Sequence, residues 1–143
     1  MSLTKGLKSL MAFEYDFSVD GGAIGAIPLR QTAGIALAAG VRITDVYVVA
    51  SDLLTSDGSA TVTVGNTTAA AGYMADIFAL VSGAGKASVR AGEVVGDLIF
   101  DDTNDHQILY SPLVAADLDL NLTVAVAALT AGKLKVFVEY FAA

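Results

Sequence analysis

The chain has 143 residues, enough for one domain with a sizeable core and too few for two ordinary ones. It lacks cysteine, which excludes disulfides and thiolate metal sites, and its net charge of −7 argues against broad contacts with nucleic-acid phosphates, which require Lys and Arg. Although 55% of the residues are hydrophobic, no apolar run approaches the roughly 20 residues of a membrane-spanning helix. We therefore expect neither a nucleic-acid nor a membrane partner.

The first ten residues carry Lys5 and Lys8 but few bulky apolar side chains. This composition predicts an N-terminal arm over residues 1–10 that is loose or lies on a neighbouring molecule. Glu14 follows before a hydrophobic stretch of signal-peptide length develops, so we expect an unprocessed protein made in the cytoplasm. Residues 11–143 are predicted to form a single domain.

Alternation of apolar and polar residues predicts strands in the first half of this domain. The first strand is "FEYDFSV" at 13–19. A short strand follows around "AIGAIPLR" at 23–30, where Pro28 confines it to an edge or an end. The run "VRITDVYVVASDLL", the turn "TSDGS" and the run "ATVTVGN" then predict a hairpin within residues 41–66.

Residues 67–82 break this alternation and predict one amphipathic helix. Thr67 or Thr68 is suited to cap it, and the glycines at 83 and 85 are suited to end it. The apolar residues that recur at helical spacing are Tyr73, Met74, Ile77, Phe78 and Val81.

Strand patterns resume at 86–100, pass through an acidic loop at 101–105 and return at 106–114. About eight short strands with turn signals between them are typical of a mainly β protein. The predicted fold is therefore a jelly roll or two-sheet β-sandwich of about eight strands with one short helix.

The last segment, "LNLTVAVAALTAGKLKVFVEY", predicts a closing hairpin whose loop is Thr130, Ala131 and Gly132. In this register Leu122, Val124 and Val126 form one apolar face with Tyr140, Val138 and Val136. The opposite face pairs Ala127 with Lys135 and Ala125 with Phe137. Small side chains beside an aromatic ring suit a surface that another sheet or subunit covers. Ala125, Ala127 and Phe137 are therefore the predicted interface residues.

Few residues have the pattern of a catalytic or metal site. His106 is the only histidine, and it lacks the nucleophile or further ligands that a triad or metal site needs. The run "SGAGKAS" at 82–88 lacks the Ser or Thr after Lys86 that a phosphate-binding loop requires, and a helix end explains it better.

Acidic residues occur in three groups, each of which also fits a solvated surface. Asp117, Asp119 and Asn121 have the initial spacing of a calcium loop, but leucines alternate with them and the required Gly and Glu are absent. An acidic loop at 101–105 contains Asp101, Asp102 and Asp105, and the strand glutamates available as a carboxylate pair are Glu14, Glu93 and Glu139. We predict no catalytic residue, no cofactor and no metal, and hence no enzyme.

Three stretches resemble small virion proteins of tailed bacteriophages that decorate or cement the capsid. They are "AGVRITDVYVVASDLLTSDGSATVTVG", "YMADIFAL" and "LTVAVAALTAGKLKVFVEYF", within a likeness that covers roughly residues 11–141. The resemblance implies a jelly-roll or sandwich fold, a homo-oligomer that is commonly a trimer, and attachment to the major capsid protein at the virion's outer surface.

This resemblance gives the interface residues an expected use. Ala125, Ala127 and Phe137 are expected to pack against a sister subunit, and Lys5 and Lys8 to meet acidic capsid surface. The alternative is a carbohydrate- or receptor-binding head fibre domain built on exposed aromatic side chains. The tyrosines available for it are Tyr15, Tyr47, Tyr73, Tyr110 and Tyr140.

Overall fold

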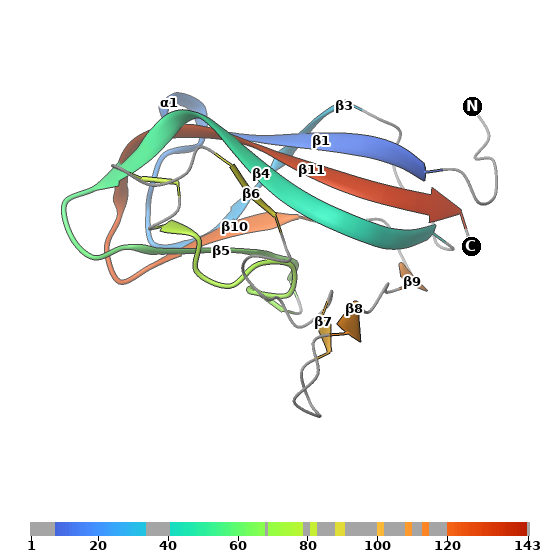
Figure 1. Cartoon of the computed structure of the whole chain (residues 1–143). Helices are drawn as coiled ribbons and strands as arrows, with labels where there is room; N and C mark the ends of the chain where they lie inside the picture. Colours follow the sequence, from blue (N-terminus) through green and yellow to red (C-terminus); the bar gives the residue numbers. More distant parts are fainter. Residues whose placement is uncertain are drawn as a thin grey trace.

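The protein is a β-sandwich of two antiparallel sheets, seen edge-on in the computed structural model (Figure 1). This structure describes residues 8–33, 41–67, 69–78, 81–82, 88–90, 100–101, 108–109, 113–114 and 120–142. The mainly β, two-sheet architecture predicted from the sequence is confirmed.

The larger sheet has the strand order β3-β1-β11-β4-β6, and β9 also pairs with β4. Its strands are β1 (Lys8–Asp16), β3 (Arg30–Ala33), β4 (Val41–Ser56), β6 (Ser88–Arg90), β9 (Leu113–Val114) and β11 (Leu129–Ala142). The smaller sheet has the order β2-β10-β5, with β2 (Gly25–Pro28), β5 (Thr61–Gly65) and β10 (Asn121–Ala125). A separate pair joins β7 (Phe100–Asp101) to β8 (Ile108–Leu109).

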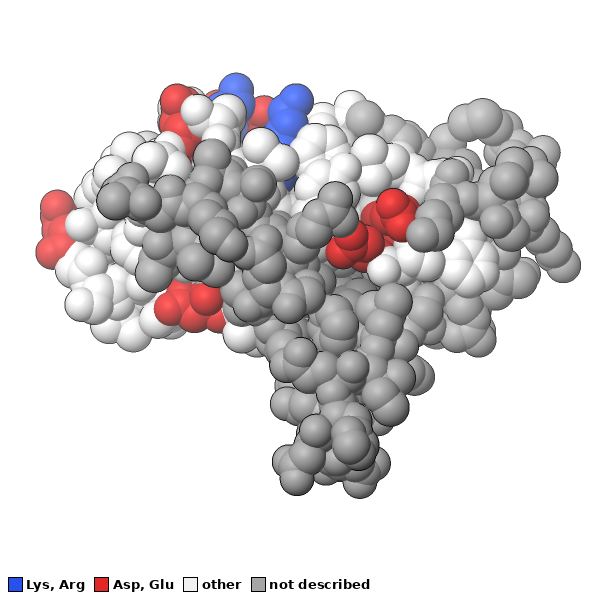
Figure 2. Space-filling model, viewed as in Figure 1, with Lys and Arg blue, Asp and Glu red and all other residues white. Residues whose placement is uncertain are grey.

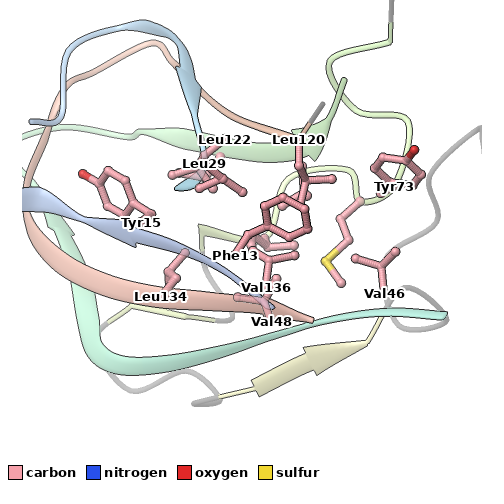
Figure 3. Packing of buried hydrophobic residues seen from close by; sticks show 14 of the residues in the cluster. Phe13, Tyr15, Leu29, Val46, Val48, Tyr73, Leu120, Leu122, Leu134 and Val136 are labelled. Atoms are coloured by element: carbon pink, nitrogen blue, oxygen red, sulfur yellow. The ribbon is translucent and has the colours of Figure 1, made fainter. Parts of the chain in front are cut away.

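The core fills the space between the two sheets, where alternate side chains of each strand point inward (Figure 3). In β11 the buried residues are Leu129, Leu134, Val136, Val138 and Tyr140, and in β10 they are Leu122 and Val124. Among the residues that the structure describes, no charged or polar residue is buried as a whole, although the Oγ1 atom of Thr123 is. The interior is therefore held by apolar packing.

The predicted closing hairpin is wrong, and Val126, expected on its apolar face, is exposed. The rest of that face is buried as expected, at Leu122, Val124, Val136, Val138 and Tyr140. β10 and β11 do not pair, because β10 lies between β2 and β5 while β11 lies between β1 and β4. The chain turns at residues 126–128 and crosses from one sheet to the other. The expected loop residues belong to β11 itself, whose pairing with β4 is interrupted by β-bulges in this region.

The hairpin predicted within residues 41–66 is wrong for the same reason. β4 pairs with β11 in the larger sheet, whereas β5 pairs with β10 in the smaller one. Residues 57–60 therefore form a second crossing between the sheets. We call residues 57–60 and 126–128 the two arches, and Figure 1 shows both at the same end of the sandwich, away from the chain termini.

Two further predictions near the N-terminus need correction. The strand expected at 13–19 starts earlier and ends at Asp16, whose side chain accepts a hydrogen bond from the Ser18 amide and so caps the short helix α1 (Phe17–Asp20). Because Lys8–Leu10 already pair with β11, the predicted arm overlaps the sheet at these residues.

The helix predicted at 67–82 is absent from the described part of that segment. Residues 69–77 form turns and bends, and the amides of Tyr73 and Met74 donate to the Val64 carbonyl. The predicted apolar residues still enter the core, since Tyr73, Met74, Ile77 and Val81 are buried. Spacing alone did not distinguish a helix from turns that deliver the same side chains inward.

Pro28 lies in β2 at the edge of the smaller sheet, as predicted. The next residue, Leu29, is buried between β2 and β3, and its amide donates to the Leu120 carbonyl at 2.9 Å. A single residue therefore carries the chain from one sheet to the other, because its apolar side chain fills the intervening core.

The crossing of β10 and β11 is testable with engineered cysteines, since the native chain has none. Ala125 and Thr61 are directly paired, so a Thr61→Cys/Ala125→Cys variant should form a disulfide on mild oxidation. Ala125→Cys/Phe137→Cys should not, because these residues lie on opposite sheets, about 10 Å apart. Mass spectrometry that counts free thiols detects the disulfide in either variant. A disulfide in the second variant alone would show that β10 pairs with β11 as a hairpin.

Gly132 and Gly25 provide a matched test of close packing around β11. The two glycines have nearly the same positive φ, 132° for Gly132 and 130° for Gly25. A Cβ on Gly132 would lie 2.9 Å from the Leu54 Cα, whereas a Cβ on Gly25 would meet nothing within 4 Å. Gly25→Ala should lower the free energy of unfolding by about 1–3 kcal/mol. Gly132→Ala should cost about 1–3 kcal/mol more, because Leu54 must move. Equal losses in urea unfolding would contradict the packing at Leu54.

Candidate interaction surface

The outward side chains of the larger sheet include a row of apolar residues across its three long strands. Phe137 in β11 is paired with Ala12 in β1 on one side and with Tyr47 in β4 on the other. The rings of Tyr47 and Phe137 stack, with centroids 5.0 Å apart and an interplanar angle of 20°. Both rings remain partly exposed.

Two further aliphatic side chains extend this row. Leu10 is 45% exposed and Val49 is 37% exposed, and each lies two register positions from the row of Phe137, on the same face. We call the whole surface the outer patch; it consists of Leu10, Ala12, Tyr47, Val49 and Phe137. A contiguous apolar surface with aromatic residues at its centre is typical of protein interfaces.

Charged residues border the outer patch. Glu139 and Asp45 pair across β11 and β4 on one side, and Glu14 and Lys135 pair across β1 and β11 on the other. Glu139 is held in place because its Oε1 accepts a hydrogen bond from Thr44 Oγ1 at 2.9 Å. The patch thus has the apolar centre and polar rim that a specific interface needs.

A cluster of ion pairs lies next to this rim, where α1 follows β1. Arg30 donates to Asp20 through Nε at 3.2 Å and Nη2 at 3.0 Å, and its Nη1 is 3.4 Å from Glu14. Lys133 Nζ lies 3.5 Å from Glu14 and 4.0 Å from Asp16. In Figure 2 basic atoms gather beside acidic ones over α1 and β1. We call these five residues the charged corner.

Hydrogen bonds in the charged corner lower the pKa of Asp16 and Asp20. Burial opposes the charge of Asp20, but hydrogen bonds from Arg30 and the Asp16 amide lower the pKa of its carboxyl below the usual value. Hydrogen bonds from the side chain and amide of Ser18 lower the pKa of Asp16. Burial, with the nearby charges of Asp20 and Asp16, raises the pKa of Tyr15 to about 12, so its hydroxyl stays protonated and donates to the Gly21 carbonyl at 2.6 Å.

This geometry does not favour acid–base or metal chemistry. A general acid needs a raised carboxyl pKa, and here Asp16 and Asp20 have lowered ones. Within the described residues, no group of three or more His, Asp or Glu side chains is arranged to hold a metal ion. His106, Lys86, Glu93, Asp102 and Asp105 lie outside the described residues, as do Asp117 and Asp119. What the site offers is a surface for contact.

The structure separates the predicted interface residues. Phe137 belongs to the outer patch, Ala125 lies in the other sheet, and Ala127 packs against the core from an arch. The expectation that they share one face is therefore wrong, because it assumed that β10 pairs with β11. Lys5 lies outside the described residues, and Lys8 is the first residue of β1.

Sequence reasoning missed the contribution of Tyr47 to the outer patch. Its position in "VYVVA" indicates an outward strand residue, but its contact with Phe137 spans 90 positions of sequence and depends on the pairing of β4 with β11. The other described tyrosines, Tyr15, Tyr73 and Tyr140, are buried. Of the tyrosines considered for a binding platform, Tyr47 is the described one that reaches the surface.

No helix in the described residues has the length and apolar character needed to cross a membrane.

Comparison with known proteins finds likeness at the level of structure. No family model and no curated protein sequence matches the chain. A chain of a solved structure entitled "Cyanophage Pam1 capsid asymmetric unit" superposes with a TM-score of 0.65 at 17% identity, covering 97% of this chain and 87% of that one. A chain of "Acidic stable capsid structure of Helicobacter pylori bacteriophage KHP30" superposes with a TM-score of 0.50 at 15% identity, covering 98% of this chain and 91% of that one. The protein shares its fold with these two chains over nearly its whole length.

The charged corner predicts a loss of stability in acid that depends on Arg30. Because the folded protein holds the pKa of Asp20 below its usual value of 3.8, this carboxylate stabilises the fold above that pH and ceases to do so as the pH falls further. Arg30→Gln should raise the pKa of Asp20 and move the acid unfolding midpoint to higher pH. Lys135→Gln removes the same charge from an exposed position and should leave the midpoint unchanged. Equal behaviour of the two variants in pH-dependent circular dichroism would contradict the role of Arg30.

Proposed function

We propose that this chain is a structural protein of a tailed-phage virion that decorates and cements the outer surface of the capsid. In this proposal it self-associates, commonly as a trimer, and binds the major capsid protein through weak contacts that many copies multiply. It is made in the host cytoplasm, acts in the virion, and has no catalytic role.

The observation that carries the proposal is the likeness to a chain of the cyanophage capsid structure. It covers almost all of both chains, so the matching chain is a small protein of similar length rather than a large protein with one similar domain. Fold alone does not define function, and here the surface of the molecule supplies further support.

The outer patch is that second support. A decorating protein needs a rigid body and an adhesive face, and the stacked Tyr47 and Phe137 provide apolar area at low entropic cost. Linking several subunits through such a face raises the effective concentration of each remaining capsid contact. Each contact with the capsid is then weak, but together the many contacts stabilise the shell.

A second candidate function is a carbohydrate- or receptor-binding head fibre domain. The specific observation in its favour is the same aromatic pair, since stacked exposed rings also bind sugars. The two functions differ in what contacts the two rings: a sister subunit in the structural role, and a sugar in the alternative. Glycan-array binding that is lost in Tyr47→Ala would favour the alternative, whereas oligomers without glycan binding favour the structural role.

Substitution of Phe137 tests the structural role. Phe137→Asp places a charge at the centre of the outer patch and removes an apolar ring, so self-association should weaken at least about tenfold. Multi-angle light scattering during size-exclusion chromatography should then show a monomer where the native protein is an oligomer.

The matched control is Ala70→Asp, which introduces the same charge in an exposed turn. It should leave the oligomer intact, and thermal unfolding should show that both variants are folded. If Phe137→Asp forms the same oligomer as the native protein, the outer patch is not the surface through which the subunits associate. A native protein that stays monomeric and does not bind capsids lacking this chain would reject the proposed function as a whole.

A further inference from the structure

The arch at residues 126–128 contains a strained backbone position occupied by an exposed valine. Val126 has φ = 70° and is the only non-glycine residue with positive φ among the described residues. The Ala127 amide donates to the Ala125 carbonyl at 2.9 Å, which closes a three-residue turn around Val126. A γ-turn of this hand is rare and strained, and β-branched residues are the least suited to it.

The valine side chain does not offset this strain within the monomer. It is 71% exposed, more than any other large hydrophobic residue that the structure describes. Glycine or asparagine would adopt the same backbone with less strain. Strain of this kind is found where a function maintains it.

Other exposed apolar side chains lie at the same end of the sandwich. Gly25 pairs with Val124, which brings Ile24, 60% exposed, alongside the chain that leads into Val126. Val19 in α1 is 66% exposed, and α1 leads to Gly22, whose carbonyl accepts from the Leu129 amide at 2.8 Å. We call Val19, Ile24 and Val126 the arch tip.

The arches are braced against each other, so the arch tip is presented by a fixed support. Ser56 Oγ donates to the Ala128 carbonyl at 2.7 Å and accepts from the Gly58 amide at 3.2 Å. A Cβ on Gly58 would lie 2.9 Å from the Ala127 Cβ, so the two arches are in close contact.

A negative charge lies beside the arch tip. Asp57 in the neighbouring arch is exposed, and Figure 2 shows acidic atoms at the end where the β4–β5 arch lies. The nearby cations, Arg30 and Lys133, are engaged by carboxylates in the charged corner. Two copies of this end would repel each other, so a second copy of the chain does not suit it.

From these observations we infer that the arch tip docks into an apolar pocket bordered by Lys or Arg on a different protein. The inference rests on the proposed function, in which that protein is the capsid shell: the outer patch joins sister subunits and the arch tip meets the shell. Val126 enters the pocket, and Asp57 faces its basic rim.

The test uses the full chain and capsids of the encoding virus prepared without it. Val126→Gly relieves the strain and removes the side chain, so the melting temperature should rise by roughly 2–8 °C while capsid affinity falls about tenfold or more. Val126→Ile keeps the backbone strain and the apolar contact, so its melting temperature and its capsid affinity should equal those of the native chain. Ile24→Ser should weaken binding without the gain in stability. Binding should also weaken as salt is raised.

The outcomes separate this inference from the proposed function. If the native chain binds capsids and Val126→Gly binds equally well, the arch tip is not the contact, although the decorating role stands. If Val126→Gly instead dissociates the native oligomer in light scattering, the occupant is a second copy and the inference is overturned. If the native chain binds no capsid at all, the proposed function and the inference both fail.

Discussion

The structure depends on one constraint: β4 and β5, and likewise β10 and β11, follow each other in the chain but lie in opposite sheets, so their apolar faces meet across the core. β10 buries Leu122 and Val124 from one side, and β11 buries Val136 and Val138 from the other. Each such side chain contributes about 1.5–3 kcal/mol when removed from water. Because no charged or polar residue of the described interior is buried as a whole, this apolar contact between sheets is what orders the connections around it.

The same constraint determines what the surface presents. When β11 is placed between β1 and β4, its outward residues acquire new neighbours, and Phe137 meets Tyr47 and Ala12. The outer patch is therefore a product of long-range pairing. The charged corner arises similarly, since Arg30 and Lys133 come from strands on either side of β1 and converge on Glu14. Apolar and charged surfaces are adjacent but distinct, which gives an interface both affinity and orientation.

The crossings between sheets also distribute backbone strain unevenly. Gly132 takes its positive φ beside Leu54, where a side chain has no room, so glycine is required by packing. Val126 takes its positive φ at an arch in open solvent, where packing makes no such demand. The contrast separates a position governed by the fold from one whose residue serves contact with something outside it.

The sequence by itself determined the composition of the core and the class of fold. Period-two alternation identified which residues of β10 and β11 face inward, and Pro28 indicated a sheet edge, because both signals depend on the local backbone. Only the tertiary structure decided the partner of each strand. The predicted loop at 130–132 lies within β11, and the chain turns earlier, at 126–128. A hairpin and an arch both bury Leu122, Val124, Val136 and Val138, so burial does not distinguish them. The difference between them lies in pairings such as that of Phe137 with Tyr47, which join residues far apart in the chain and leave no local signature.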